Sequence, residues 1–468
     1  MKANDTIIAL ATSSGVGAIA VIRISGNKAI EITNSFFQSK YRKKDLTQVK
    51  THTIHLGSII ENNHIIDEVL ISVFKNPNSY TGENVVEINC HGSVYIQQEI
   101  IQLFLKNGVR NANPGEFTLR AFLNGKMDLS QAEAVADLIA SDSAASHQVA
   151  MQQMRGGFSS EIQTLRQQLL NFASLIELEL DFAEEDVAFA DRKEFELLVN
   201  KISEILKKLI DSFALGNVLK NGIPVAIVGE PNVGKSTLLN ALLNEEKAIV
   251  SPIEGTTRDA IEDELIIDGV AYRFIDTAGI RNTEDFVENI GIKKTFEKIE
   301  QAQLVIYLID LEKLASHKTS LKAIDLEINK LQDKHPSKQV IIIANKVDLV
   351  TSDIKTKVSE SFKNKSLLFI SAKSKTGIDK LTATLTKLAN KGALSNNETI
   401  VSNSRHFEAL NNALIAIKDV QKGIDDKISS DLLAIDIHEA LHNLGLITGE
   451  ITTEDLLGNI FANFCIGK

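Results

Sequence analysis

The sequence predicts a multidomain protein that combines α/β domains with an all-α domain. Its 468 residues are too many for one ordinary hydrophobic core, so about three domains are expected. Short β-rich runs punctuated by loops fill residues 1–125, which predicts a compact α/β domain. Apolar residues recur at helical spacing through 126–216 and again through 391–468, whereas 217–390 alternates apolar strands with helices. These four segments make up three predicted domains, because the two helical segments are expected to form one domain together.

The helical segments show a regular apolar stripe. One example has residues four, three, four and four positions apart: Leu165, Leu169, Phe172, Ile176 and Leu180. This spacing is typical of long helices that bury one face. Because the two helical stretches flank the strand-rich segment, we expect one helical domain that is interrupted by an inserted α/β domain.

The strand-rich segment predicts a mainly parallel sheet. Its strands are apolar throughout, which suits strands buried on both faces. The dipeptide Asp268-Gly269 lies between two further apolar runs and predicts a hairpin, so one edge pair should be antiparallel. The buried strands are expected at residues 225–228, 304–309, 340–343 and 367–370.

Composition narrows the class of protein. The 61 acidic and 50 basic residues give a net charge of −11, so bulk electrostatics repel nucleic acid, and an RNA partner needs a local basic patch or a helper protein. Two cysteines make no disulfide framework and favour a reducing, cytoplasmic location. Residues 6–22 are interrupted by polar and glycine residues, which predicts two short strands around a turn rather than a signal peptide. No stretch reaches the ~20 apolar residues of a membrane helix, and no membrane association is expected.

A phosphate-binding loop is the strongest motif. Residues 229–236, Gly-Glu-Pro-Asn-Val-Gly-Lys-Ser, match G-x-x-x-x-G-K-[ST] between a predicted strand and a predicted helix. In this pattern Lys235 places positive charge on the β- and γ-phosphates and the Ser236 hydroxyl ligates Mg²⁺, while the helix N-terminus favours the anion. The expected contacts with the nucleotide come from Asn232, Val233, Gly234, Lys235, Ser236 and Thr237.

Three later motifs identify guanine as the base. Asp348 ends Asn345-Lys346-Val347-Asp348, and its carboxylate can accept hydrogen bonds from the N1–H and 2-amino groups of guanine, which adenine lacks. Residues 255–259 fit a switch segment that orders around the γ-phosphate, with Thr257 as second magnesium ligand. In this order the motifs resemble the translation-factor-related GTPases, and they predict a Ras-like P-loop GTPase domain. The remaining predicted GTP contacts are Asp276, Thr277, Ala278, Gly279, Asn345, Lys346, Ser371, Ala372 and Lys373.

Two details bear on hydrolysis. Ile280 follows Gly279 where Ras-like proteins carry a glutamine that orients the attacking water, so another group must do so. Asn232 lies inside the phosphate loop, where its side-chain oxygen either coordinates a monovalent cation or merely shapes the loop; residue chemistry leaves both interpretations open.

Over essentially its whole length the chain closely resembles the tRNA-modifying GTPase family MnmE, also called TrmE. The resemblance extends beyond the GTPase motifs, with one departure at Cys90-His91-Gly92-Ser93, where glycine is expected at both ends. We find no acidic partner for His91 in the sequence and interpret it as a core or turn histidine. The segments that carry the resemblance are 80–83, 114–118, 120–126, 180–182, 256–259 and 464–468.

The resemblance implies a homodimer whose GTPase domains pair face to face and are activated by potassium. Glu288 matches the glutamate that orients the attacking water through a second water, which fills the role that Ile280 cannot. The implied potassium ligands are Asn232, Ser251, Ile253 and Thr256, and Ser251 and Thr256 would also contact GTP.

The resemblance also implies an N-terminal domain like the folate-binding domain of one-carbon enzymes. It would dimerise and bind 5-formyl-tetrahydrofolate or a related folate through Arg23, Glu87, Lys126 and Lys468. Cys465 matches a cysteine required for tRNA modification; taken alone, it is a partly buried cysteine or a reactive thiol.

We therefore predict a GTP hydrolase that supports tRNA modification. In the family, a flavin-dependent MnmG-type partner joins the dimer, and a carboxymethylaminomethyl group is added to carbon 5 of the wobble uridine of tRNA. The competing interpretation is a ribosome-assembly GTPase. Such proteins usually carry a basic RNA-binding domain, and the sequence shows none.

Overall fold

The computed structural model of the chain divides into two compact units. The first holds Met1–Ile139, Gln153–Ser203 and Ala409–Lys468, and the second holds Ala140–Gln152 and Glu204–Glu408. The structure describes residues 5–42, 44–181, 192–243, 248–250, 263–275, 299–336, 338–390, 399–426, 428–462, 464–465 and 467.

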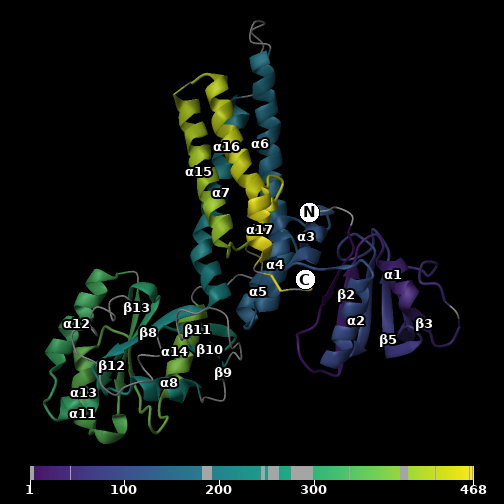
Figure 1. The fold of residues 1–468 in the computed structure, drawn as a ribbon. Helices are drawn as coiled ribbons and strands as arrows, with labels where there is room; N and C mark the ends of the chain where they lie inside the picture. The colour runs from purple at the N-terminus through teal and green to yellow at the C-terminus, as the bar shows by residue number, and fades with distance from the viewer. Residues whose placement is uncertain are drawn as a thin grey trace. The chain divides into compact units, whose positions relative to one another are not determined.

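The first unit contains a seven-stranded N-terminal sheet (Figure 1). Strands β1 (Ile7–Leu10) and β2 (Ile19–Ser25) pair antiparallel, which confirms the two strands predicted around a turn. Helices α1 (Ala29–Phe36) and α2 (Val94–Lys106) pack on one face, where side chains such as Ile22 and Ile88 are fully buried. The alternate residues of the same strands therefore lie on the opposite face. The strand order is β3 (Phe37–Ser39), β4 (Thr53–Glu61), β5 (His64–Phe74), β6 (Val85–His91), β2 (Ile19–Ser25), β1 (Ile7–Leu10) and β7 (Arg110–Asn111).

Helices complete the first unit. The long α6 (Gly157–Asp181) packs along α16 (Ser430–Thr448), so segments before and after the inserted domain share one helical domain, as predicted. Helix α3 (Glu116–Leu123) contacts α17 (Glu454–Ala462), and their apolar residues form a core with α4 (Leu129–Ala140). The helices α5 (Ala144–Met154), α7 (Arg192–Asn221) and α15 (Ser404–Asp425) belong partly to each unit. No helix within the described residues is long and apolar enough to cross a membrane.

The second unit contains the predicted parallel sheet. Its strands run parallel from β14 (Leu367–Phe369) to β11 (Val270–Phe274), and β10 (Asp263–Ile267) and β9 (Ala248–Val250) continue the sheet antiparallel. The β10–β11 hairpin turns at Asp268 and Gly269, both at positive φ (49° and 79°), which confirms the predicted turn. The order is β14 (Leu367–Phe369), β13 (Gln339–Asn345), β12 (Leu304–Asp310), β8 (Ile223–Gly229), β11 (Val270–Phe274), β10 (Asp263–Ile267) and β9 (Ala248–Val250).

Helices cover both faces of this sheet and leave one edge for binding. Helices α8 (Lys235–Leu243) and α14 (Ile378–Asn390) pack on one face. On the other lie α11 (Leu311–Ala315), α12 (Leu321–Lys334) and α13 (Ser352–Ser361). The carboxyl ends of β8, β12 and β13 meet at one edge, which is where parallel α/β sheets bind ligands.

Candidate functional site

The phosphate-binding loop connects β8 to α8 in a conformation that its glycines allow. Gly229 has φ +147°, and a Cβ there would lie 2.6 Å from the Leu308 carbonyl oxygen. Asn232 is exposed at φ +61°, in the left-handed region. The Lys235 ammonium donates to the carbonyls of Gly229 (2.8 Å) and Glu230 (3.0 Å), so the predicted phosphate-binding cation lies inside its own loop. Ser236 lies half-buried in the first turn of α8, and Thr237 beside it is exposed.

Asn345 joins this loop to the region expected to bind the base. Its Nδ2 donates to the Val233 carbonyl (2.9 Å), and its Oδ1 accepts from the Ala372 N–H (3.0 Å). Asn345 is 3% exposed, and both partners are buried. The amide is therefore a fixed connection between three segments that are far apart in sequence, and the structure brings these predicted site residues together.

The carboxylate of Asp348, the predicted base-recognition residue, has a lowered pKa and stays ionised. A hydrogen bond with Ser371 lowers the pKa of Asp348 most, and the charges of Lys373 and Lys346 lower it further. Asp348 lies in the exposed turn Val347–Leu349, while Ser371 is 1% exposed. This arrangement presents a charged, solvent-facing hydrogen-bond acceptor, which is what the predicted recognition of guanine needs.

Part of the predicted GTP site falls outside the described residues. These positions include the second magnesium ligand, most predicted potassium ligands and the proposed water-orienting glutamate, and their roles stay predictions. They are Ser251, Ile253, Thr256, Thr257, Asp276, Thr277, Ala278, Gly279 and Glu288.

A second candidate site surrounds Arg23 in the N-terminal domain. Two guanidinium nitrogens contact a single oxygen of Glu87, with Nε–Oε1 at 2.9 Å and Nη2–Oε1 at 2.8 Å. The guanidinium also lies 5.4 Å from the ring centre of Tyr80 and 5.7 Å from that of Phe117. Arg23 and Glu87 are register partners on β2 and β6, and their side chains are 17% and 24% exposed. The structure thus places two predicted folate ligands in direct contact.

The end of the chain docks at the same place. The Gly467 carbonyl accepts from Arg23 Nη1 at 3.4 Å, and a Cβ on Gly467 would lie only 2.3 Å from the Leu10 carbonyl oxygen. Cys465 precedes it and is exposed, so the interpretation as a partly buried cysteine is wrong. The predicted ligand Lys126 is exposed, and its side chain lies near Gly82. Gly82 belongs to the same loop as Tyr80. Lys468 lies outside the described residues.

A partly buried ionic network supports this site, and the sequence analysis did not identify it. Arg120 contacts Glu83 (3.1 Å), Glu116 (2.9 Å) and Asp5 (2.6 Å), and Arg110 contacts Glu116 at 2.6 Å. Burial raises the pKa of Glu116, but hydrogen bonds from Arg110, the Asn113 N–H and Arg120 outweigh it, and the pKa is lowered overall. Most of these residues lie in the segments 80–83, 114–118 and 120–126, which carry the family resemblance. The sequence therefore marked these residues, but it did not show that they form ion pairs with one another.

The structure corrects the interpretation of His91. Its Nδ1 lies 2.7 Å from Asp67 Oδ1, and its N–H donates to Asp67 Oδ2 at 2.8 Å. The side chain of His91 is 68% exposed and that of Asp67 is 8% exposed. His91 is therefore a surface residue at the end of β6 with a buried acidic partner, not a core or turn histidine.

Comparison with known proteins shows matches along the whole chain. A family model described as the MnmE helical domain matches residues 129–465, and one described as the GTP-binding protein TrmE N-terminus matches residues 6–126. A solved structure of the G domain of the T. maritima FeoB iron transporter covers 36% of this chain and 98% of that chain at 21% identity, with a TM-score of 0.25, too low for a structural conclusion.

Curated relatives match at high identity. The tRNA modification GTPase MnmE of Flavobacterium johnsoniae is 64% identical over 99% of both chains. Those of Christiangramia forsetii and Flavobacterium psychrophilum are 63% and 62% identical over 100% and 99% of both chains. These alignments and the two family models together cover the sheet domain, the helical domain and the nucleotide site described above, and the chain belongs to the tRNA modification GTPase MnmE family.

Proposed function

We propose that the chain hydrolyses GTP to GDP in a potassium-activated reaction that supports modification of the wobble uridine of tRNA. The observation that carries the nucleotide assignment is the Asn345 amide, which holds the phosphate-binding loop and the base-recognition segment in one arrangement. Asp348 adds the ionised carboxylate that pairs with the N1–H and 2-amino groups of guanine. A bound nucleotide would thus be held at both ends.

Within the described residues, Ser236 and Asn232 have the chemistry to bind a magnesium ion and a monovalent cation at the phosphates. Ser236 stands at the start of α8 beside Lys235, where a hydroxyl can join the ion's ligands, and Thr257 is the proposed second ligand. Asn232 is exposed on the loop and is the proposed potassium ligand, with Ser251, Ile253 and Thr256. The cations would neutralise charge on the phosphates. Glu288 is proposed to orient the attacking water.

The N-terminal site is proposed to bind 5-formyl-tetrahydrofolate or a related folate. Both Arg23 contacts use Glu87 Oε1, and within the described residues Oε2 of Glu87 has no hydrogen-bond donor. That oxygen can accept from the guanidine-like edge of a pterin ring. Lys126 and Lys468 are the proposed cations for the anionic tail of the ligand, and the exposed Cys465 lies close enough in sequence to Gly467 to reach the same region.

The proposed assembly is a cytoplasmic homodimer that acts on tRNA with an MnmG-type flavoprotein and adds a carboxymethylaminomethyl group to carbon 5 of the uridine. The net charge of −11 supports shared tRNA recognition, because a chain with this net charge repels nucleic acid unless a local basic patch or a partner offsets the repulsion.

Two measurements test the proposal. GTP turnover by the purified full chain should be faster in potassium chloride than in sodium chloride at equal ionic strength. Glu288→Ala should keep nucleotide affinity and abolish turnover, whereas Glu300→Ala, a nearby control, should retain it. Equal turnover in both salts, or a fully active Glu288→Ala variant, would contradict the assigned roles.

The folate and tRNA assignments need their own experiment. Calorimetric titration of 5-formyl-tetrahydrofolate should show saturable binding that Glu87→Gln weakens, while Glu68→Gln, which removes an exposed carboxylate paired with Lys40, should not weaken it. Nucleoside analysis of tRNA from a depleted strain should show loss of the modified wobble uridine. Intact modification together with immature ribosomal subunits would instead support the ribosome-assembly interpretation.

A further inference from the structure

The short helix α11 lies between the phosphate-binding loop and the proposed base-recognition segment, residues 345–348. Asp310 at the end of β12 caps it, because its Oδ1 accepts from the backbone N–H groups of Glu312 (2.9 Å) and Lys313 (3.3 Å). Asp310 is 5% exposed, so the cap is fixed by burial as well as by hydrogen bonds. We call Asp310, Glu312 and Lys313 the α11 brace.

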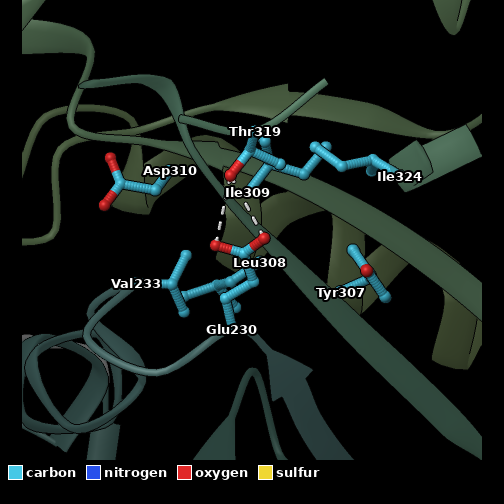
Figure 2. Close-up of a pocket in the computed structure, with 8 residues that line it drawn as sticks. All are labelled: Glu230, Val233, Tyr307, Leu308, Ile309, Asp310, Thr319 and Ile324. Atoms are coloured by element: carbon cyan, nitrogen blue, oxygen red, sulfur yellow. Dashed lines mark hydrogen bonds between the residues drawn. The ribbon is translucent and has the colours of Figure 1, made fainter. Parts of the chain in front are cut away.

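One end of the brace holds the phosphate-binding loop. The Lys313 ammonium lies 3.0 Å from Glu230 Oε2 and donates to the Pro231 carbonyl at 3.2 Å. The same Glu230 carboxylate accepts from the Thr319 hydroxyl at 3.2 Å and 3.4 Å, as Figure 2 shows at the rim of the cavity behind the loop. Two successive residues of the loop are thus attached to one lysine.

The other end of the brace holds the base-recognition segment. Lys346, within Asn345-Lys346-Val347-Asp348, lies 2.8 Å from Asp310 Oδ2 and 3.0 Å from Glu312 Oε2. Asp310 therefore uses one oxygen to start α11 and the other to bind Lys346. This path is separate from the Asn345 amide, which joins the same two segments on the buried side.

The Pro231 contact matters because of the residue that follows. Asn232 lies at φ +61°, in the left-handed region that asparagine enters more readily than most other non-glycine residues. A hydrogen bond to the Pro231 carbonyl fixes the peptide that joins Pro231 to Asn232. The orientation of the Asn232 side chain at the phosphates then depends on Lys313.

We propose that Lys313 is a positioning residue of the nucleotide site, which holds Glu230 and the Pro231 peptide so that the phosphate-binding loop keeps Asn232 in place. The inference rests on the proposed binding of guanine nucleotide. Neither Glu230 nor Lys313 reaches the nucleotide itself in this role; both act through the backbone of the loop.

The test compares nucleotide release in full-length variants. Lys313→Met should release a fluorescent GDP analogue about two- to five-fold faster, because a partly exposed ion pair (31% and 43% exposed) and one hydrogen bond are lost. Lys313→Arg should restore most of the wild-type rate. Lys318→Met is the matched control, since Lys318 is exposed and makes no ion pair within the described residues, and it should release GDP at the wild-type rate.

A double-mutant cycle separates positioning from general destabilisation. Glu230→Gln and Lys313→Met should be non-additive in the release rate, and Lys313→Met should raise the potassium concentration for half-maximal turnover. Additive effects, or release by Lys313→Met within about 1.5-fold of the control, would overturn the inference. If the wild-type chain fails to bind the GDP analogue, the proposed function fails instead.

Discussion

Replacing Gly234 by alanine tests whether the Asn345 connection controls nucleotide binding. Gly234 has φ +99°, and a Cβ there would lie 2.5 Å from Asn345 Nδ2, well inside the closest normal contact. A side chain at this backbone conformation costs about 1–2 kcal/mol. Moving the Asn345 amide aside breaks its bonds to Val233 and Ala372, each worth about 0.5–1.5 kcal/mol.

The binding-competent loop is therefore about 2–5 kcal/mol less favourable in Gly234→Ala. Since apparent affinity falls with the competent fraction, Kd for GDP should rise roughly 30- to 4,000-fold. Equilibrium titration with a fluorescent GDP analogue measures this change. Gly108→Ala is the control, because Gly108 also has positive φ (85°) but nothing lies within 4 Å of its Cβ. A Gly234→Ala variant that binds GDP within about three-fold of wild type would refute the reasoning.

Three other perturbations have expected outcomes. Gly467→Ala should weaken folate binding, because the added Cβ displaces the chain end from Leu10. Gly125→Ala should not weaken it, since Gly125 also has positive φ (67°) but no atom lies within 4 Å of an added Cβ. Equal calorimetric affinities of the two variants would exclude a role for the docked chain end. Asp348→Asn should bind xanthosine diphosphate better than GDP in competition titrations, because the amide can donate where the carboxylate only accepts; unchanged guanine preference would contradict the assignment. The lowered pKa of Glu116 contributes stability that is present above its ordinary value of 4.5 and is lost as the pH falls through the lowered value of the folded state. The urea concentration at the midpoint of unfolding should therefore decrease once the pH is below about 4.5. This decrease should be smaller in Arg110→Met, which lacks one of the hydrogen bonds that lower the pKa of Glu116.

The elements of the fold were largely predictable because their signals are local. Apolar runs identified the buried strands of the second unit, and Asp268-Gly269 identified the hairpin and its antiparallel edge. The phosphate-binding loop was equally clear, since its glycines and its lysine must stand at fixed spacing. Each of these inferences needs only neighbouring residues.

Contacts between distant residues could not be predicted in the same way. His91 meets Asp67 because β5 and β6 pair antiparallel, which places the end of β6 beside the first residues of β5. The α11 brace depends likewise on the order of β8, β12 and β13 in the sheet. The sequence motifs identify Lys346 and the phosphate-binding loop, but they do not indicate that α11 connects the two.

The N-terminal site shows how contacts between distant residues change the role expected of a predicted ligand. Arg23 was expected as a ligand cation, yet its guanidinium already contacts Glu87, two aromatic rings and the Gly467 carbonyl. Because Glu87 Oε2 stays available, a pterin edge can bind there without breaking the Arg23–Glu87 pair. A ligand that needed Arg23 itself would have to displace the chain end. Arg23 therefore acts first as the residue that docks the chain end beside Glu87, and any ligand at Glu87 binds next to the segment that carries Cys465.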